Sequence, residues 1–174
     1  MEAFFWEYSE LIVFLHVMSA VVWVGGMIAM RFAAHHSFME LDHPPVRIQR
    51  TTHALKRLFT IVTPFVILLL ITAILMAVGW GFKAAAIDAN GNIIDEAAYA
   101  AHQLIYLKEA IWTVMALNLL AMILRRNRAE KLVLAGNFAE AKAKLELIGK
   151  YMVPVNIILG IIAIYLGVTL RYSH

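Results

Sequence analysis

Residues 58–82 read LFTIVTPFVILLLITAILMAVGWGF, a run of 25 residues without one charged side chain. A helix needs about 20 apolar residues to cross a hydrocarbon core of about 30 Å. Pro64 lies inside the run, and a membrane helix tolerates it because neighbouring helices can satisfy the carbonyl that it leaves free. The run therefore predicts a transmembrane helix.

Three further apolar runs of similar length occur, at about residues 11–34, 104–124 and 151–170. The chain has 174 residues, of which 62% are hydrophobic and 16% charged. An average soluble domain has about 25% charged residues, so this chain has too few to cover a soluble surface. We predict an all-α, integral membrane four-helix bundle forming one domain, with helices at about residues 5–34, 54–82, 102–126 and 150–171.

The charges are spread unevenly over the connections. Residues 35–57 and 125–150 are basic, whereas residues 83–101 and the segment before the first run are mainly acidic. The positive-inside rule places the two basic connections in the cytoplasm and both termini outside a bacterial inner (plasma) membrane. Orientation thereby explains nearly all basic residues, and nucleic-acid binding has no support. Because no basic residue precedes the first run, we interpret it as a retained helix rather than a signal peptide.

Two connections carry structural signals of their own. Residues 125–150 alternate apolar and charged side chains, which predicts a helix that lies on the membrane surface or extends the third span. Residues 88–92 read DANGN, a turn signal, and Pro44-Pro45 predicts a break. The chain contains no cysteine, which excludes disulfides, thiolate metal sites, iron–sulfur clusters and covalent c-type haem. The nine methionines form no closely spaced motif, so we interpret most of them as packing residues rather than copper ligands.

Polar residues inside membrane helices are costly and therefore candidates for function. His16 lies about five residues, or roughly 8 Å, inside its apolar run, and Lys108 lies about four residues inside its own, counted from the same side. A neutral imidazole and a neutral amine both offer a lone pair, so the two side chains could bind a haem iron, one on each face. Alternatively, His16 is a hydrogen-bonded packing residue, and Lys108 reaches the interface or pairs with Glu10 or Glu109.

Four further residues are candidates for cofactor contact. Trp23 follows His16 by seven residues and shares its helical face. Arg57 could pair with a haem propionate, although orientation and phospholipid contact also explain it. His102 lies at the outer entry of the third helix and competes with Lys108 as a ligand. His53 could serve a second haem or a divalent metal, or be merely solvated, as could its neighbours His35, His36 and His43.

The spans also resemble a known family. Residues 15–27, LHVMSAVVWVGGM, resemble the His–Trp–Gly opening of HemJ-like and CopD-like membrane proteins. Residues 57–64, RLFTIVTP, are similar to the Arg and Thr-Pro of the second HemJ-like helix, and residues 102–125 resemble the helix that carries the family's Lys. The resemblance covers about three helices. It departs in the fourth, where HemJ-like proteins have Asn-Glu-x-Pro and this chain has Pro154 before Asn156, without the Glu.

The resemblance implies a four-helix membrane protein with b-type haem. In HemJ-like members the iron ligands are the first-helix His and the third-helix Lys, which correspond to His16 and Lys108, and the activity is oxidation of protoporphyrinogen IX to protoporphyrin IX in porphyrin biosynthesis. CopD-like members are linked to copper handling. The chain is also longer than these proteins, mainly through residues 83–101 and 125–150. Both departures bear on the substrate more than on the haem.

We therefore expect a haem b-binding oxidoreductase or electron-transfer protein of the bilayer, with a tetrapyrrole or a quinol as reductant. Homo-oligomers are compatible with this interpretation. Two alternatives of other classes stay open: a copper-handling membrane protein without haem, and a structural or assembly subunit whose polar groups serve helix packing.

Overall fold

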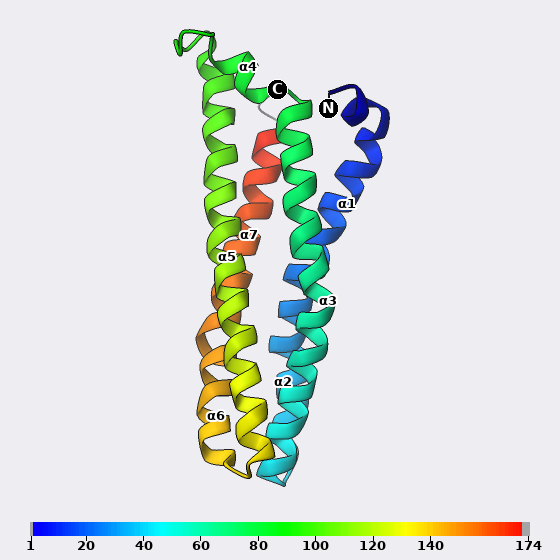
Figure 1. Ribbon diagram of the computed structural model, residues 1–174, viewed down its shortest axis with the longest axis vertical. Helices are drawn as coiled ribbons and strands as arrows, with labels where there is room; N and C mark the ends of the chain where they lie inside the picture. Colours follow the sequence, from blue (N-terminus) through cyan, green and yellow to red (C-terminus); the bar gives the residue numbers. More distant parts are fainter. Residues whose placement is uncertain (1, 172–174) are drawn as a thin grey trace.

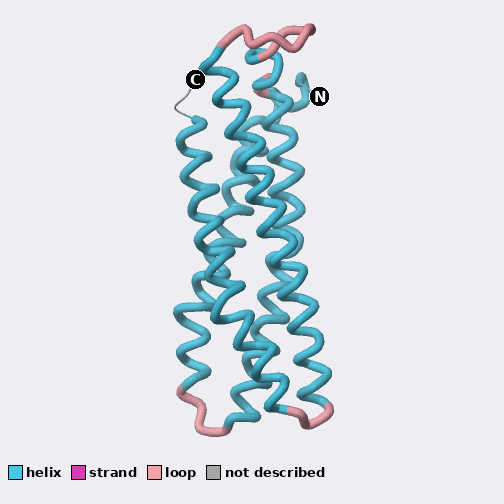
Figure 2. Tube along the Cα trace, turned by 90° about the vertical axis from the view of Figure 1, so that its left-hand side faces the viewer, coloured by secondary structure: helices cyan, strands magenta, loops and turns pink. Residues whose placement is uncertain are grey.

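The computed structural model describes residues 2–171 and the side chains of residues 3–170. It consists of four long rods standing side by side (Figures 1 and 2), each long and apolar enough to cross a membrane. The prediction of an all-α four-helix membrane bundle is confirmed. The elements of the rods are α1 (Glu2–Ala29), η1 (Met30–Ala34) and α2 (His35–Met39); α3 (Pro44–Gly79); α5 (Glu96–Leu134); and α6 (Phe138–Leu147), η2 (Ile148–Met152) and α7 (Val153–Arg171).

The rods occupy the corners of a square. Helix α1 packs against α3 and α7, and α5 packs against the same two helices. Helices α1 and α5 therefore stand at diagonal corners. The start of α1, the end of α7 and the short helix α4 (Phe82–Ala86) lie at one end of the bundle, which we call the terminal end; α2 and α6 lie towards the other, which we call the α6 end (Figure 1).

The rods are longer than the sequence predicted. Helices α3 and α5 contain 36 and 39 residues, or about 54 and 58 Å at 1.5 Å per residue, against a hydrocarbon core of about 30 Å. The predicted helix ends near residues 54, 126 and 150 are thus wrong, because the bundle core continues through the polar segments. The buried residues in these segments are Ile48, Thr52, Leu55, Arg126, Ala129, Ala141, Leu145 and Ile148. The α6 end projects as a helical extension beyond the apolar spans.

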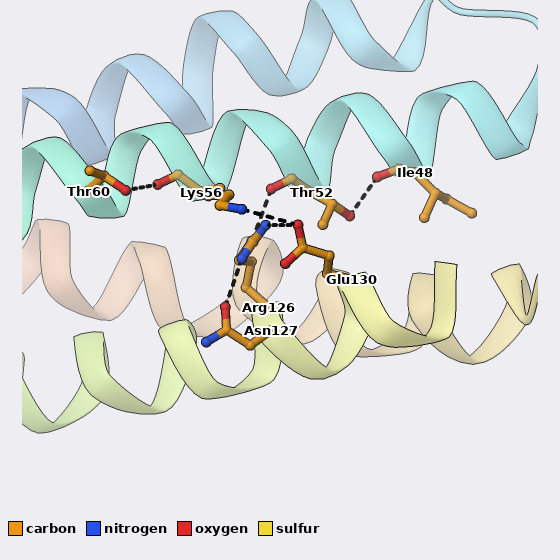
Figure 3. Close-up of polar contacts among 7 residues, drawn as sticks. All are labelled: Ile48, Thr52, Lys56, Thr60, Arg126, Asn127 and Glu130. Carbon is orange, nitrogen blue, oxygen red and sulfur yellow. Dashed lines mark hydrogen bonds and ion pairs between the residues drawn. The ribbon is translucent and has the colours of Figure 1, made fainter. Parts of the chain in front are cut away.

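A buried arginine holds this extension together (Figure 3). Arg126 on α5 is only 3% exposed. Its Nε donates to the Thr52 carbonyl on α3 at 3.2 Å, and its guanidinium lies 2.8 Å from a Glu130 carboxylate oxygen that Lys56 approaches to 3.5 Å. Arg126 therefore joins two helices, a role that the charge pattern alone did not indicate.

A pair of amides joins α5 to the fourth rod inside the apolar region. Asn118 Nδ2 donates to Asn156 Oδ1 at 2.7 Å and to the Met152 carbonyl at 2.8 Å. Asn156, which is 1% exposed, returns a hydrogen bond to the Met115 carbonyl at 3.3 Å. These contacts satisfy amide groups that would otherwise be costly in hydrocarbon.

The connection between α4 and α5 contains the predicted turn. Gly91 adopts a φ of 88°, and the Asp88 carboxylate accepts hydrogen bonds from the Asn92 side chain and backbone. These bonds hold the pKa of Asp88 below its ordinary value. Asp95 then caps α5 by accepting from the Ala98 N–H at 3.0 Å. The turn at residues 88–92 is confirmed, and so is the break at Pro44, which begins α3.

Candidate cofactor site

His16 on α1 is oriented by a threonine of α3. Its Nδ1 lies 3.0 Å from Thr72 Oγ1, and Thr72 is 2% exposed. Thr72 Oγ1 also lies 2.8 and 3.0 Å from the Leu68 and Leu69 carbonyl oxygens, to which the hydroxyl can donate its single proton. When the hydroxyl donates to its own helix in this way, its oxygen accepts from His16 Nδ1–H. In a neutral imidazole this leaves the lone pair on Nε2.

Lys108 on α5 is half-buried and extends to the surface of α7. A Cβ built on Gly167 would lie 3.1 Å from Lys108 Nζ, so the amine rests where α7 has no side chain. Among the described side chains, neither Glu10 nor Glu109 pairs with it. A Cβ built on Gly160 of α7 would meet Val24 of α1 and Met115 of α5, which sets the register of these three helices. His16, Lys108 and Gly167 each lie seven or eight residues from that contact towards the terminal end, so they share one level.

These contacts define one level of the bundle to which each rod contributes a residue. His16, Thr72, Lys108 and Gly167 come from α1, α3, α5 and α7. Because α1 and α5 occupy diagonal corners, an imidazole and an amine approach from opposite corners of an apolar bundle. The expected depth match between His16 and Lys108 agrees with this arrangement, whereas their binding of a cofactor stays a prediction. Thr72 and Gly167 were not among the site residues predicted from the sequence.

Trp23 lies in the core, two turns further along α1 than His16. It is 1% exposed, and its indole N–H has no acceptor among residues 2–171. Trp112 differs, because its indole donates to the Val66 carbonyl at 3.3 Å. Gly26, three residues after Trp23, lets Leu58 of α3 pack closely, as helix packing predicts.

His102 lies in a different environment from Lys108. It is 8% exposed, its ring contacts Tyr106 at a centroid distance of 4.8 Å, and its Nδ1 has no hydrogen-bond partner in the described part of the chain. Six residues, or about 9 Å of helix, separate it from Lys108. His102 is therefore a separate buried imidazole that lies nearer the terminal end than Lys108.

Arg57 and His53 are not brought to this level. Both side chains are exposed on α3, on the face that Thr60 and Pro64 share. Arg57 lies 15 residues from Thr72, which is roughly 22 Å along the helix, and His53 is further still. A group held beside His16 is out of their reach, because the helix register of α3 places them near the α6 end.

The suggested divalent metal site at the histidines of the α6 end is not supported. His35 and His36 have ring centroids 6.2 Å apart, but no group of three or more His, Asp or Glu in the described chain could hold a metal ion. His35 and His36 lie on α2, whereas His43 is the residue before α3 and His53 lies within α3, so the four histidines come from different elements.

Comparisons of the chain with protein-family models, with curated proteins and with solved structures gave no match. The HemJ-like and CopD-like resemblance therefore stays a prediction from the residues quoted above. The fold and the geometry of the site carry the functional argument.

Proposed function

We propose that this multi-pass membrane protein binds haem b and is an oxidoreductase or electron-transfer protein of a bacterial inner membrane, with His16 and Lys108 as the iron ligands. The observation that carries the proposal is the shared level of His16, Thr72, Lys108 and Gly167, one from each rod. A tetrapyrrole such as protoporphyrinogen IX, or a quinol, is the proposed reductant.

The donor set suits haem better than a metal bound by side chains alone. A porphyrin supplies four ligands to its iron, so the protein needs to supply only one or two. His16 and Lys108 offer two nitrogens from opposite corners. Zinc or copper bound by His and carboxylate side chains without a porphyrin commonly takes three or more protein ligands. Residues 2–171 contain no such His, Asp or Glu group, and the nine methionines form no closely spaced motif in the sequence. This contrast favours haem over the copper alternative.

Each residue of the level has a definite task. Thr72 accepts from His16 Nδ1–H, which fixes the ring orientation and directs Nε2 as the ligand atom. Lys108 must lose its proton before its nitrogen can bind iron, and no carboxylate pairs with it among the described side chains. Gly167 provides room for the amine. Bound haem would supply one-electron redox chemistry, while the apolar helices around it exclude water.

The visible absorption spectrum of the purified full-length chain tests this proposal. The protein is expressed with haem precursors present, and haem is quantified per chain by its pyridine complex. We expect an intense Soret band and stoichiometric haem b. A chain without a Soret band after expression under these conditions would contradict the proposal, and metal analysis of the same sample would identify copper if copper is the true ligand.

A further inference from the structure

A kink near the start of α1 opens a groove at the terminal end. Tyr8 leaves helical geometry with φ −116° and ψ 20°, and the Ser9 hydroxyl donates to the Trp6 carbonyl at 3.4 Å beside it. A shallow, wide-open groove of about 440 Å³ lies beside the kink. Its lining residues are Trp6, Ser9, Glu10, Val13, Phe14 and Trp80.

Two indoles form the walls of this groove, and a buried ring holds both. Phe5 is buried against Gly79 of α3, where the absent side chain lets the ring approach closely. The Phe5 ring makes edge contacts with Trp6 at 5.4 Å and with Trp80 at 5.7 Å. Trp80 also contacts Phe82 at 5.8 Å. The indoles are thus positioned before any ligand arrives.

The charge of the groove is negative. Glu10 lines it and forms no ion pair with any described side chain. Glu7 is the next charged residue towards the N-terminus, and the first Lys or Arg of the chain is Arg31. Lys83 on α4 follows Trp80 by three residues but does not line the groove. A carboxylate beside exposed indole faces is the chemistry that recognises an organic ammonium group.

The position of the groove indicates which kind of molecule carries that ammonium group. Exposed aromatic side chains such as Trp6 and Tyr8 mark the membrane interface, and the apolar side chains of Val13 and Phe14 continue the groove along α1 into the apolar span. An inorganic cation would leave this apolar part unused, whereas a lipid would cover it with an acyl chain.

We propose that this groove binds an aminophospholipid, with the headgroup ammonium at Glu10 between Trp6 and Trp80 and an acyl chain along Val13 and Phe14. The proposal does not depend on a cofactor at His16. A lipid bound here would brace the kinked first turns of α1 against α3.

Native mass spectrometry of the full chain in detergent tests the proposal. Phosphatidylethanolamine and phosphatidylglycerol with identical acyl chains are added in equal amounts, and the bound lipids are counted. We expect the wild-type chain to retain phosphatidylethanolamine preferentially. Glu10→Gln should lower that preference about fivefold, the effect of losing one partly exposed charge contact.

Two further variants keep the test decisive. Glu96→Gln removes an exposed carboxylate from the same end, on α5 and outside the groove, and should leave the preference unchanged. Trp80→Leu keeps the charge and removes an aromatic wall, so it should lower the preference. An unchanged preference in Glu10→Gln or in Trp80→Leu, or an equal loss in Glu96→Gln, would overturn the proposal. Circular dichroism checks that each variant retains its helices.

Discussion

His16 Nδ1 lies 3.0 Å from the Thr72 hydroxyl oxygen, across the interface between α1 and α3. Two carbonyls of its own helix lie within hydrogen-bond distance of the Thr72 hydroxyl. With the Thr72 proton donated to one of them, the imidazole donates from Nδ1 and Nε2 is its basic nitrogen. A histidine held in this way by a second residue is oriented like a metal ligand. The same contact is also a hydrogen bond between helices, so the two roles have to be separated by experiment.

Thr72→Val removes the acceptor and nearly keeps the side-chain shape. We expect haem affinity to fall about tenfold, because second-shell partners of a ligating histidine typically contribute that much. Haem retained per chain during dilution measures the loss. Thr60→Val is the matched control, since Thr60 is exposed and its hydroxyl, among the described residues, donates to its own helix at the Lys56 carbonyl. Equal haem retention in both variants would mean that the His16–Thr72 contact serves helix packing and does not support haem binding.

Gly167→Ala places a methyl group 3.1 Å from Lys108 Nζ, tighter than ordinary van der Waals contact. The amine must shift by a few tenths of an ångström, so we expect a weakened lysine ligand and a changed ferric spectrum with the helical content preserved. Gly25→Ala serves as the control, because a Cβ at Gly25 would meet nothing within 4 Å. An identical spectrum for Gly167→Ala and wild type would mean that Lys108 does not bind iron through this position.

The four spans were predictable because runs such as residues 58–82 are long and mostly apolar, and that one contains no charged side chain, so hydropathy detects them directly. The extension at the α6 end was not. Its core consists of isolated buried residues, such as Thr52, Ala129 and Ala141, in segments rich in charged residues. Hydropathy averaged over a window of such a segment is low, so it does not detect a narrow buried face. Arg126 was missed for the same reason, since a buried arginine and an orienting arginine look alike in sequence.

Two of the four residues of the candidate site could be predicted by counting residues from the ends of the apolar runs. His16 and Lys108 stand out as polar residues at matching depth, and the structure agrees on their level. Thr72 and Gly167 need the register between antiparallel helices, which depends on loop and kink geometry that the sequence does not state. A usable signal existed for Thr72, the polar residue in the middle of an otherwise apolar stretch of the second run, but threonine commonly bonds to its own helix and carries little information alone.

The Asn118–Asn156 pair should stabilise the bundle without affecting the cofactor. We expect a coupling free energy of about 0.5–1.5 kcal/mol between Asn118→Leu and Asn156→Leu, as for hydrogen bonds between other membrane helices. Unfolding in SDS of both single variants and the double variant measures it. Asn118 lies about 15 Å along α5 from Lys108, so the absorption spectrum should not change. Additive effects of the two substitutions would contradict the coupling.

The orientation of the bundle is testable because the chain has no native cysteine. Gln49 and Asn90 are exposed at opposite ends. From the positive-inside rule we expect Asn90→Cys in intact cells to react with a membrane-impermeant maleimide, and Gln49→Cys to react only after the membrane is opened. The reverse labelling pattern would place the α6 end outside and overturn the predicted topology.

The ferric absorption spectrum, recorded against pH for variants of the three candidate ligands, distinguishes a His16–Lys108 haem site from one that uses His102. We predict that His16→Ala loses haem, because the surrounding helix faces offer no replacement ligand. His102→Ala should keep the six-coordinate spectrum and the acid transition in which a protonated lysine leaves the iron, whereas Lys108→Ala should lose both. A six-coordinate spectrum and acid transition that survive in Lys108→Ala but disappear in His102→Ala would contradict the His16–Lys108 site.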